Sequence, residues 1–204
     1  MKDLRNENNQ ISTLKPKILL LGGGGHCKSV IDVIEQEDKY NIVGIIDKKE
    51  LIGSDVLGYK VIGCDEDLAN LREKYTNAIV TVGQIKSNAL RVKLFALLKD
   101  LDYTLASIIS PLVYISKHAT IEEGTIVMHK ALVNTSVKVG KNCIINTQAL
   151  TEHDCVIEDH CHISTGAIIN GGVKVKANTF VGSNATTKEY IALSGFIKAG
   201  SVVK

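Results

Sequence analysis

The chain is poor in aromatic residues and contains no tryptophan. Aromatic side chains make up 4% of its 204 residues, so a core has to be built from Ile, Val, Leu and small residues. An excess of one charge is also missing, because 24 Lys and Arg stand against 22 Asp and Glu. A net charge of +2 argues against a protein whose affinity for nucleic acid rests on neutralising phosphates.

Long apolar runs and an export signal are absent as well. No segment approaches the roughly 18 apolar residues of a membrane span. The polar stretch over residues 1–16 lacks the apolar centre of a secretory signal. We expect residues 1–16 to form a flexible leader and the protein to be cytoplasmic. The five cysteines are an odd number in such a chain, so we expect free thiols and no disulfide framework.

A repeat of six residues fills the second half of the chain. Residues 115–204 divide into fifteen hexads without an insertion, and Ile, Val or Leu holds the first position in 12 of the 15. The fifth position is always Ala, Thr, Val, Cys or Ile. Helices repeat at about 3.6 residues and strands at 2, so neither explains this period. Short strands joined by corners explain it: three would form a triangular coil of about 18 residues, and successive coils would pair in parallel.

The sixth position of each hexad is expected to point away from the coil. Ile126, Leu132 and Ile144 are apolar residues at such positions. An exposed flat apolar wall is unfavourable in water, and association of chains would cover it. The pattern therefore predicts a homotrimer.

Residues 17–110 have the pattern of alternating strands and helices. Apolar runs over 17–21, 42–46, 78–82 and 105–109 predict four strands, and residues 28–36, 65–75 and 86–99 have helical spacing. This order predicts a Rossmann-like α/β domain with a parallel sheet and helices on its faces. We place its boundary with the coil domain, residues 111–204, near residues 110–115.

A glycine-rich loop, residues 22–25, joins the first strand to the first helix. Unpaired backbone N–H groups at a helix start suit a phosphate. Asp47 ends the second strand 22 residues after Gly25, as does the ribose-binding acid of dinucleotide folds. The dinucleotide fingerprint is incomplete, because Cys27 stands where its third glycine belongs. A nucleotide or nucleotide sugar is therefore favoured over NAD, and a purely structural turn is the alternative.

Histidine and cysteine are dense over residues 151–162. Cys155 and Cys161 occupy inward fifth positions while the histidines lie at corners or point out, so these groups cannot converge on one zinc ion, and no metal is expected. His153 is flanked by acids, and histidine has a neutral form near neutral pH, which makes His153 a candidate general base. Asp154 or its neighbour Glu152 would hold the second ring nitrogen. A solvated corner histidine is the alternative.

Gly171 follows His153 by 18 residues and should lie one coil above it. A glycine there leaves a backbone N–H uncovered beside the base, which is a suitable donor to a thioester carbonyl. A plain corner turn is the alternative. Asn146 lies on the coil wall just before His153, where its amide can contact a ligand or belong to a structural ladder.

The two halves together resemble the hexapeptide-repeat sugar acyltransferases, which include sialic acid O-acetyltransferases and UDP-amino-sugar N-acetyltransferases of the bacillosamine type. The resemblance runs from about residue 17 to about residue 188. Its motifs are GGGGH before a helix, the strand ends at Asp47 and at Val82 and Gly83, and the segment INTQALTEHDCVIEDHCHISTGAIINGG. It implies a left-handed β-helix, a nucleotide-sugar-binding N-terminal domain, and a homotrimer with acetyl-CoA between subunits.

The resemblance also implies roles for single residues. His153 matches the general base and Asp154 its acidic partner. Those that match acetyl-CoA contacts are Asn146, His162, Gly171 and Ser183. Those that match the sugar-nucleotide site are Gly24, Gly25, His26, Asp47, Lys48 and Gly83. About three residues found in relatives are missing near residues 187–195.

We therefore expect an acetyl-CoA-dependent N-acetyltransferase that acts on the amino group of a UDP-linked amino sugar. Transfer would be direct, with His153 as base and the Gly171 N–H, with His162, holding the acetyl oxygen. An O-acetyltransferase of a sialic-acid-like sugar needs the same base and donor, so it is an alternative. A non-catalytic nucleotide-binding scaffold is a third hypothesis.

Overall fold

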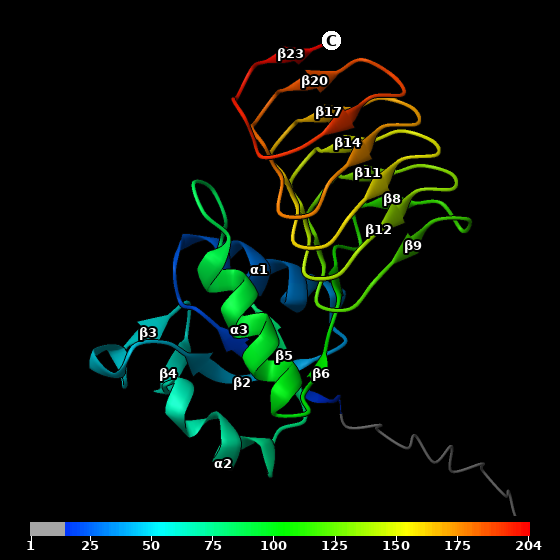
Figure 1. Cartoon of the computed structure of the whole chain (residues 1–204). Coiled ribbons are helices and arrows are strands. Elements are labelled where there is room, and N and C mark those ends of the chain that lie inside the picture. The colour runs from blue at the N-terminus through cyan, green and yellow to red at the C-terminus, as the bar shows by residue number, and fades with distance from the viewer. Residues whose placement is uncertain (1–14) are drawn as a thin grey trace, which may run out of the picture.

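The computed structural model describes residues 15–204, so nearly all of the expected leader lies outside the described residues. These residues form an α/β domain beside a triangular prism of stacked coils, and the C-terminus lies at the far end of the prism (Figure 1). No helix within residues 15–204 combines the length and apolar character needed to cross a bilayer.

The α/β domain contains one mostly parallel sheet. Its strands and helices are β1 (Lys17–Leu21), α1 (Gly25–Glu37), β2 (Asn41–Ile46), β3 (Asp55–Val56), β4 (Tyr59–Gly63), α2 (Leu68–Arg72), β5 (Asn77–Val80), α3 (Ala89–Asp100) and β6 (Thr104–Leu105), with 3₁₀ turns η1 (Lys49–Leu51) and η2 (Asp65–Asp67). The strand order is β3-β4-β2-β1-β5-β6. All pairs are parallel except β3 with β4, so the expected parallel sheet is confirmed.

Three local features differ from the sequence prediction. The antiparallel β3–β4 hairpin was not expected. The helix expected over 65–75 is shorter, because a 3₁₀ turn precedes α2 and the Asp67 carboxylate accepts the Cys64 N–H. The strand expected over 105–109 is divided. β6 pairs with β5 of the α/β domain, whereas the next strand, β7 (Ile108–Ile109), pairs with the first coil.

Helix α1 lies between the sheet and the prism. Its buried side chains, among them Ile31 and Ile34, share one core with Ile18 of β1 and with Ile108 and Ile126 of the prism. The opposite face of the sheet packs against α2 and α3. The helix that begins at the glycine loop is thus fixed to both domains.

Three parallel sheets form the three faces of the prism. Face 1 comprises β7, β10 (Ile126–Val127), β13 (Ile144–Ile145), β16 (His162–Ile163), β19 (Phe180–Val181) and β22 (Phe196–Ile197). Face 2 comprises β8 (Tyr114–Ile115), β11 (Leu132–Val133), β14 (Leu150–Thr151), β17 (Ile168–Ile169), β20 (Thr186–Thr187) and β23 (Val202–Val203). Face 3 comprises β9 (Thr120–Ile121), β12 (Lys138–Val139), β15 (Val156–Ile157), β18 (Lys174–Val175) and β21 (Ala192–Leu193).

The hexad pattern correctly predicts the interior of the prism. First-position residues such as Val133 and Ile169, and fifth-position residues such as Cys143 and Cys161, form one buried cluster. All five cysteines are free thiols, as expected, and all five are buried. From Gly124 to Tyr190 the fourth residue of every hexad has a positive φ, which turns the chain at each corner.

The hexad repeat is broken once, near its end. Only two residues separate β21 from β22, whereas four separate β20 from β21. Phe196 accordingly pairs with Phe180, which lies 16 positions before it, where an unbroken hexad repeat predicts 18. The expectation of fifteen uninterrupted hexads is therefore wrong after Leu193. Gly195, with a φ of +78°, makes the tighter corner.

The apolar residues at the sixth hexad positions are only partly exposed, in contrast to the sequence prediction. Ile126 and Ile144 are fully buried, so the expectation that they are exposed is wrong. They belong to face 1, which the α/β domain covers. Leu132 lies on face 2, where Leu150 and Ile168 continue the same outward column in half-buried positions.

Candidate active site

His153 and Asp154 form a hydrogen-bonded pair at the corner between faces 2 and 3. The chain turns there after β14, and Asp154 has the positive φ of the corner. The His153 Nδ1 lies 2.8 Å from Asp154 Oδ2, and the two side chains are 48% and 60% exposed. Since a carboxylate can only accept, this contact places an N–H at Nδ1, and in the neutral ring Nε2 is then the nitrogen with the lone pair.

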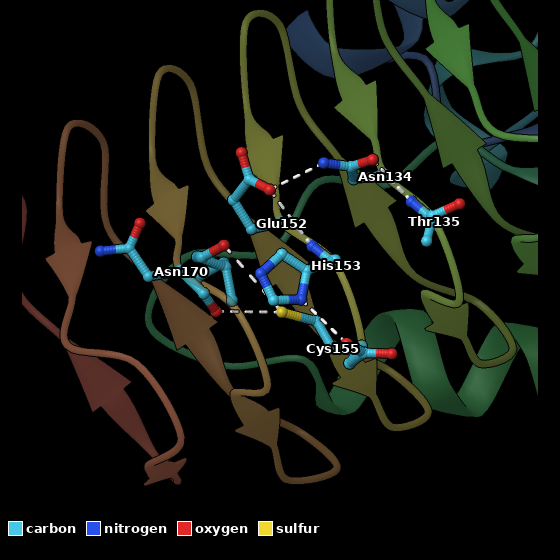
Figure 2. A network of polar contacts seen from close by, with 8 residues as sticks. Asn134, Thr135, Glu152, His153, Cys155 and Asn170 are labelled. Atoms are coloured by element: carbon cyan, nitrogen blue, oxygen red, sulfur yellow. Dashed lines mark hydrogen bonds and ion pairs between the residues drawn. The ribbon is translucent and has the colours of Figure 1, made fainter.

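The neighbouring acid, Glu152, makes its hydrogen bonds to groups other than the imidazole. Glu152 Oε2 accepts hydrogen bonds from Asn134 Nδ2 at 2.7 Å and from the backbone N–H of His153 at 3.3 Å (Figure 2). Glu152 thus fixes the backbone of the corner, and Asp154 holds the ring. The sequence left both acids open as the partner of the imidazole, and the geometry selects Asp154.

Gly171 lies directly against the imidazole. A Cβ atom at this position would be 2.7 Å from both Nε2 and Cε1 of His153. At the same corner of the two preceding coils this backbone N–H is capped by the preceding side chain: Asn134 Oδ1 accepts from Thr135, and Glu152 Oε2 accepts from His153. Asn170 instead donates its amide to the Thr187 carbonyl. Gly171 itself is buried, and among residues 15–204 no acceptor receives its N–H, so an unpaired donor lies next to the imidazole.

His162 and Asn146 lie away from the corner that holds His153. His162 is on face 1, and Asn146 is at the edge between faces 1 and 2. His162 is buried, and its Nδ1 donates to the Gln84 carbonyl at 2.6 Å. Its Nε2 therefore accepts from Asn146 Nδ2 at 3.0 Å. Burial lowers the pKa of His162 to about 4, so the ring is neutral. With its Nδ1–H bonded to Gln84 and its Nε2 unprotonated, the His162 ring has no N–H left to donate to an acetyl oxygen, which was its expected role. The side-chain amide of Asn146 is the donor that remains available.

A cavity of about 430 Å³ opens beside these two residues. Its lining consists of His26, Gly83, Gln84, Ile85, Asn146, His162, Ser164, Phe180, Gly182, Ser183, Phe196 and Ala199. It brings together five of the site residues expected from the sequence, two from the α/β domain and three from the prism. The Nε2 atom of His26 is buried and has no partner among residues 15–204, so it suits a polar group of a ligand.

The sequence analysis missed Gln84, Phe180 and Phe196. The two phenylalanine rings stack with centroids 5.1 Å apart, and Phe180 also meets the edge of the His162 ring. Outward phenylalanines in a chain this poor in rings were a signal that could have indicated the cavity. Gln84 could have been found from its place directly after the strand-end Gly83.

A second cavity, of about 250 Å³, lies at the ends of β1 and β2. Asp47 and Lys48 line it. The Asp47 carboxylate accepts the backbone N–H groups of Gly23 at 2.6 Å and Lys48 at 2.7 Å, so it shapes the glycine loop. Gly24 and Gly25 have open space beside them at the start of α1, where a phosphate could approach the backbone.

The predicted site residues therefore fall in separate places within one chain. Asn146 and Ser183 follow face 1 strands, at the edge between faces 1 and 2. His153 and Gly171 follow face 2 strands, at the edge between faces 2 and 3. The width of face 2 separates the candidate base from the larger cavity.

Known proteins similar to this chain cover both of its domains. Residues 17–98 match the PglD N-terminal domain. A structure of a histidine variant of perosamine N-acetyltransferase from Caulobacter crescentus, in complex with CoA and GDP-perosamine, is 30% identical, with a TM-score of 0.86 over 92% of this chain and 88% of that one.

Two further relatives are acetyltransferases as well. The acetyltransferase domain of PglB from Neisseria gonorrhoeae is 27% identical, with a TM-score of 0.84 over 93% of this chain and 92% of that one. GDP-perosamine N-acetyltransferase from Escherichia coli O157:H7 is 27% identical over 177 residues, covering 83% of this chain and 77% of the relative.

Proposed function

Because the chain belongs to the hexapeptide-repeat sugar N-acetyltransferases, with their left-handed β-helix, we propose that it transfers the acetyl group of acetyl-CoA to the amino group of a nucleoside-diphosphate-linked sugar. The observation that carries this proposal is the imidazole of His153 beside the Gly171 N–H, which has no acceptor among residues 15–204. A base for an amine and a donor for an acyl oxygen are the two groups that direct acetyl transfer needs.

The residues act as follows in this proposal. His153 Nε2 accepts a proton from the sugar amine as its nitrogen forms a bond to the acetyl carbon. Asp154 stabilises the imidazolium through Nδ1. The Gly171 N–H donates to the acetyl oxygen while the carbon–sulfur bond breaks, and the proton leaves with the CoA sulfur. Transfer is direct in this proposal, and the five buried cysteines are poorly placed to act as covalent nucleophiles.

The larger cavity would bind acetyl-CoA, in a site that a second protomer completes. The Asn146 amide, Ser183 and the buried His26 supply polar contacts, and the stacked phenylalanines supply an apolar surface. Face 2 offers the surface for association, since the middle of its outward column is apolar and contains Leu132, Leu150 and Ile168. A homotrimer packed through this face would bring the His153 edge of one protomer to the cavity of its neighbour.

The nucleotide that the sugar carries, UDP or GDP, is a separate part of the proposal. The resemblance seen in the sequence favours UDP, whereas one relative is named GDP-perosamine N-acetyltransferase and the structure of another is in complex with GDP-perosamine. A thermal-shift titration separates the two: a saturating diphosphate of the correct nucleoside should raise Tm by about 5–10 °C. Lys48→Ala should reduce that shift, and Lys138→Ala on face 3 should not. Absence of any shift with both nucleotides would favour the sialic-acid-like acceptor.

A transfer assay tests the activity itself. Release of free CoA from acetyl-CoA is expected with UDP-linked or GDP-linked amino sugars and not with the matching hydroxyl sugars. Mass spectrometry should show an acetamide product. Acetylation of a hydroxyl sugar alone would identify an O-acetyltransferase, and no CoA release with any acceptor would contradict the proposal.

A further inference from the structure

Arg91 of α3 is a charged side chain buried between the two domains. It is 1% exposed. Its Nη1 donates to the carbonyls of Val80 at 2.7 Å and Val82 at 2.9 Å, and its Nε donates to the carbonyl of Asn142 at 3.2 Å. Within residues 15–204 the guanidinium pairs with carbonyls and with no carboxylate. The side chain therefore joins the end of β5 to a corner of the prism.

Only an arginine can make this set of contacts. A guanidinium presents its donors in a planar fork, whereas a lysine ammonium is a point charge. Burial lowers the pKa of Arg91 to about 10, which leaves the group charged near neutral pH. Burying a charge is unfavourable unless its hydrogen bonds are made, so the carbonyls around Arg91 are held in place together.

The backbone segment that Arg91 binds continues into Gly83 and Gln84, which line the cavity proposed for acetyl-CoA. Gln84 follows Val82 by two residues, and its carbonyl accepts the Nδ1–H of His162 at 2.6 Å. The Gln84 amide donates to the His160 carbonyl at 3.1 Å, which ties the same residue to the prism. Through His162, the position of the Gln84 carbonyl also fixes the Asn146 amide that lines the cavity.

We propose that Arg91 is a positioning residue for acetyl transfer: by clamping the end of β5 to the prism, it fixes the Gln84 carbonyl, the orientation of His162 and hence the Asn146 amide. The role assigned to the cavity rests on the proposed function. Arg91 lines neither of the two cavities, so its effect on the larger cavity is exerted through Gln84 and His162.

The test combines histidine NMR with kinetics on the full chain. In the wild type, His162 should show a protonated Nδ1 and an unprotonated Nε2. Arg91→Lys and Arg91→Met should give mixed tautomers at His162 and a kcat lower by about 10–100-fold, the size of effect expected from a small misplacement. Arg72→Met is the matched control, because Arg72 lies on α2 and bonds Asp102. It should leave both readouts unchanged.

The outcomes distinguish this proposal from the proposed function. The tautomer is measured without substrate, so it does not depend on finding the acceptor sugar. A wild-type His162 protonated at Nε2 would overturn the proposal even if neither variant of Arg91 folded. A folded Arg91→Met protein with wild-type tautomer and kcat would overturn it as well. Failure of the acetylation assay alone would count against the proposed function only.

Discussion

Replacing His153 with alanine is expected to lower kcat by at least about 100-fold, the lower range for loss of a general base. The side chain is half exposed and has one hydrogen-bond partner, Asp154, so the fold should tolerate its removal. The KM for acetyl-CoA should change little, because His153 is assigned to the sugar amine, whereas the contacts assigned to acetyl-CoA come from the lining of the larger cavity. Steady-state CoA release and Tm measure the two effects.

His118→Ala is the matched control for this variant. His118 is also an exposed histidine in the prism, and it lies outside both cavities. Its replacement should leave kcat unchanged. Near-wild-type turnover in His153→Ala would contradict the assignment of His153 as the general base.

Replacing Gly171 with alanine is expected to be nearly as damaging, with a kcat lower by about 100-fold. The new methyl carbon would stand 2.7 Å from His153 Nε2, which is closer than nonbonded atoms tolerate. Gly171 does not have a left-handed backbone, so alanine can adopt its conformation and the coil should remain folded. The imidazole would have to turn away, and its lone pair would leave the reaction site.

A double-mutant cycle shows whether the methyl group acts through the imidazole. If it does, adding Gly171→Ala to His153→Ala should cost much less than Gly171→Ala costs in the wild type, since contacting residues are not additive. Wild-type kcat in the single Gly171→Ala variant, or full additivity in the double variant, would contradict this explanation.

The hexad period predicted the prism and one part of the site. Because three hexads make a coil, residues 18 apart stack, and the structure places Gly171 against His153. The same period predicted the buried columns of the interior. The period alone could not show the short corner at Gly195, and only the resemblance, through residues missing near 187–195, indicated that the chain is shorter there.

The period also could not show which face of the prism the α/β domain covers. For this reason Ile126 and Ile144 were expected at an exposed wall, although they are buried. The hydrogen bonds that join the domains were missed for the same reason. Arg91 and Gln84 lie in a different domain from Asn142 and His162, and no local pattern indicates that they meet.

Mixed oligomers test most directly the claim that the base and the acetyl-CoA cavity come from different protomers. His153→Ala and Asn146→Ala chains, each poorly active alone, would be co-expressed in equal amounts, and mixing would be verified by native mass spectrometry. We expect recovery toward about a quarter of wild-type activity, because a quarter of the interfaces pair an intact His153 with an intact Asn146. Mixed oligomers with no more activity than the parent variants, or a protein that is monomeric, would contradict it.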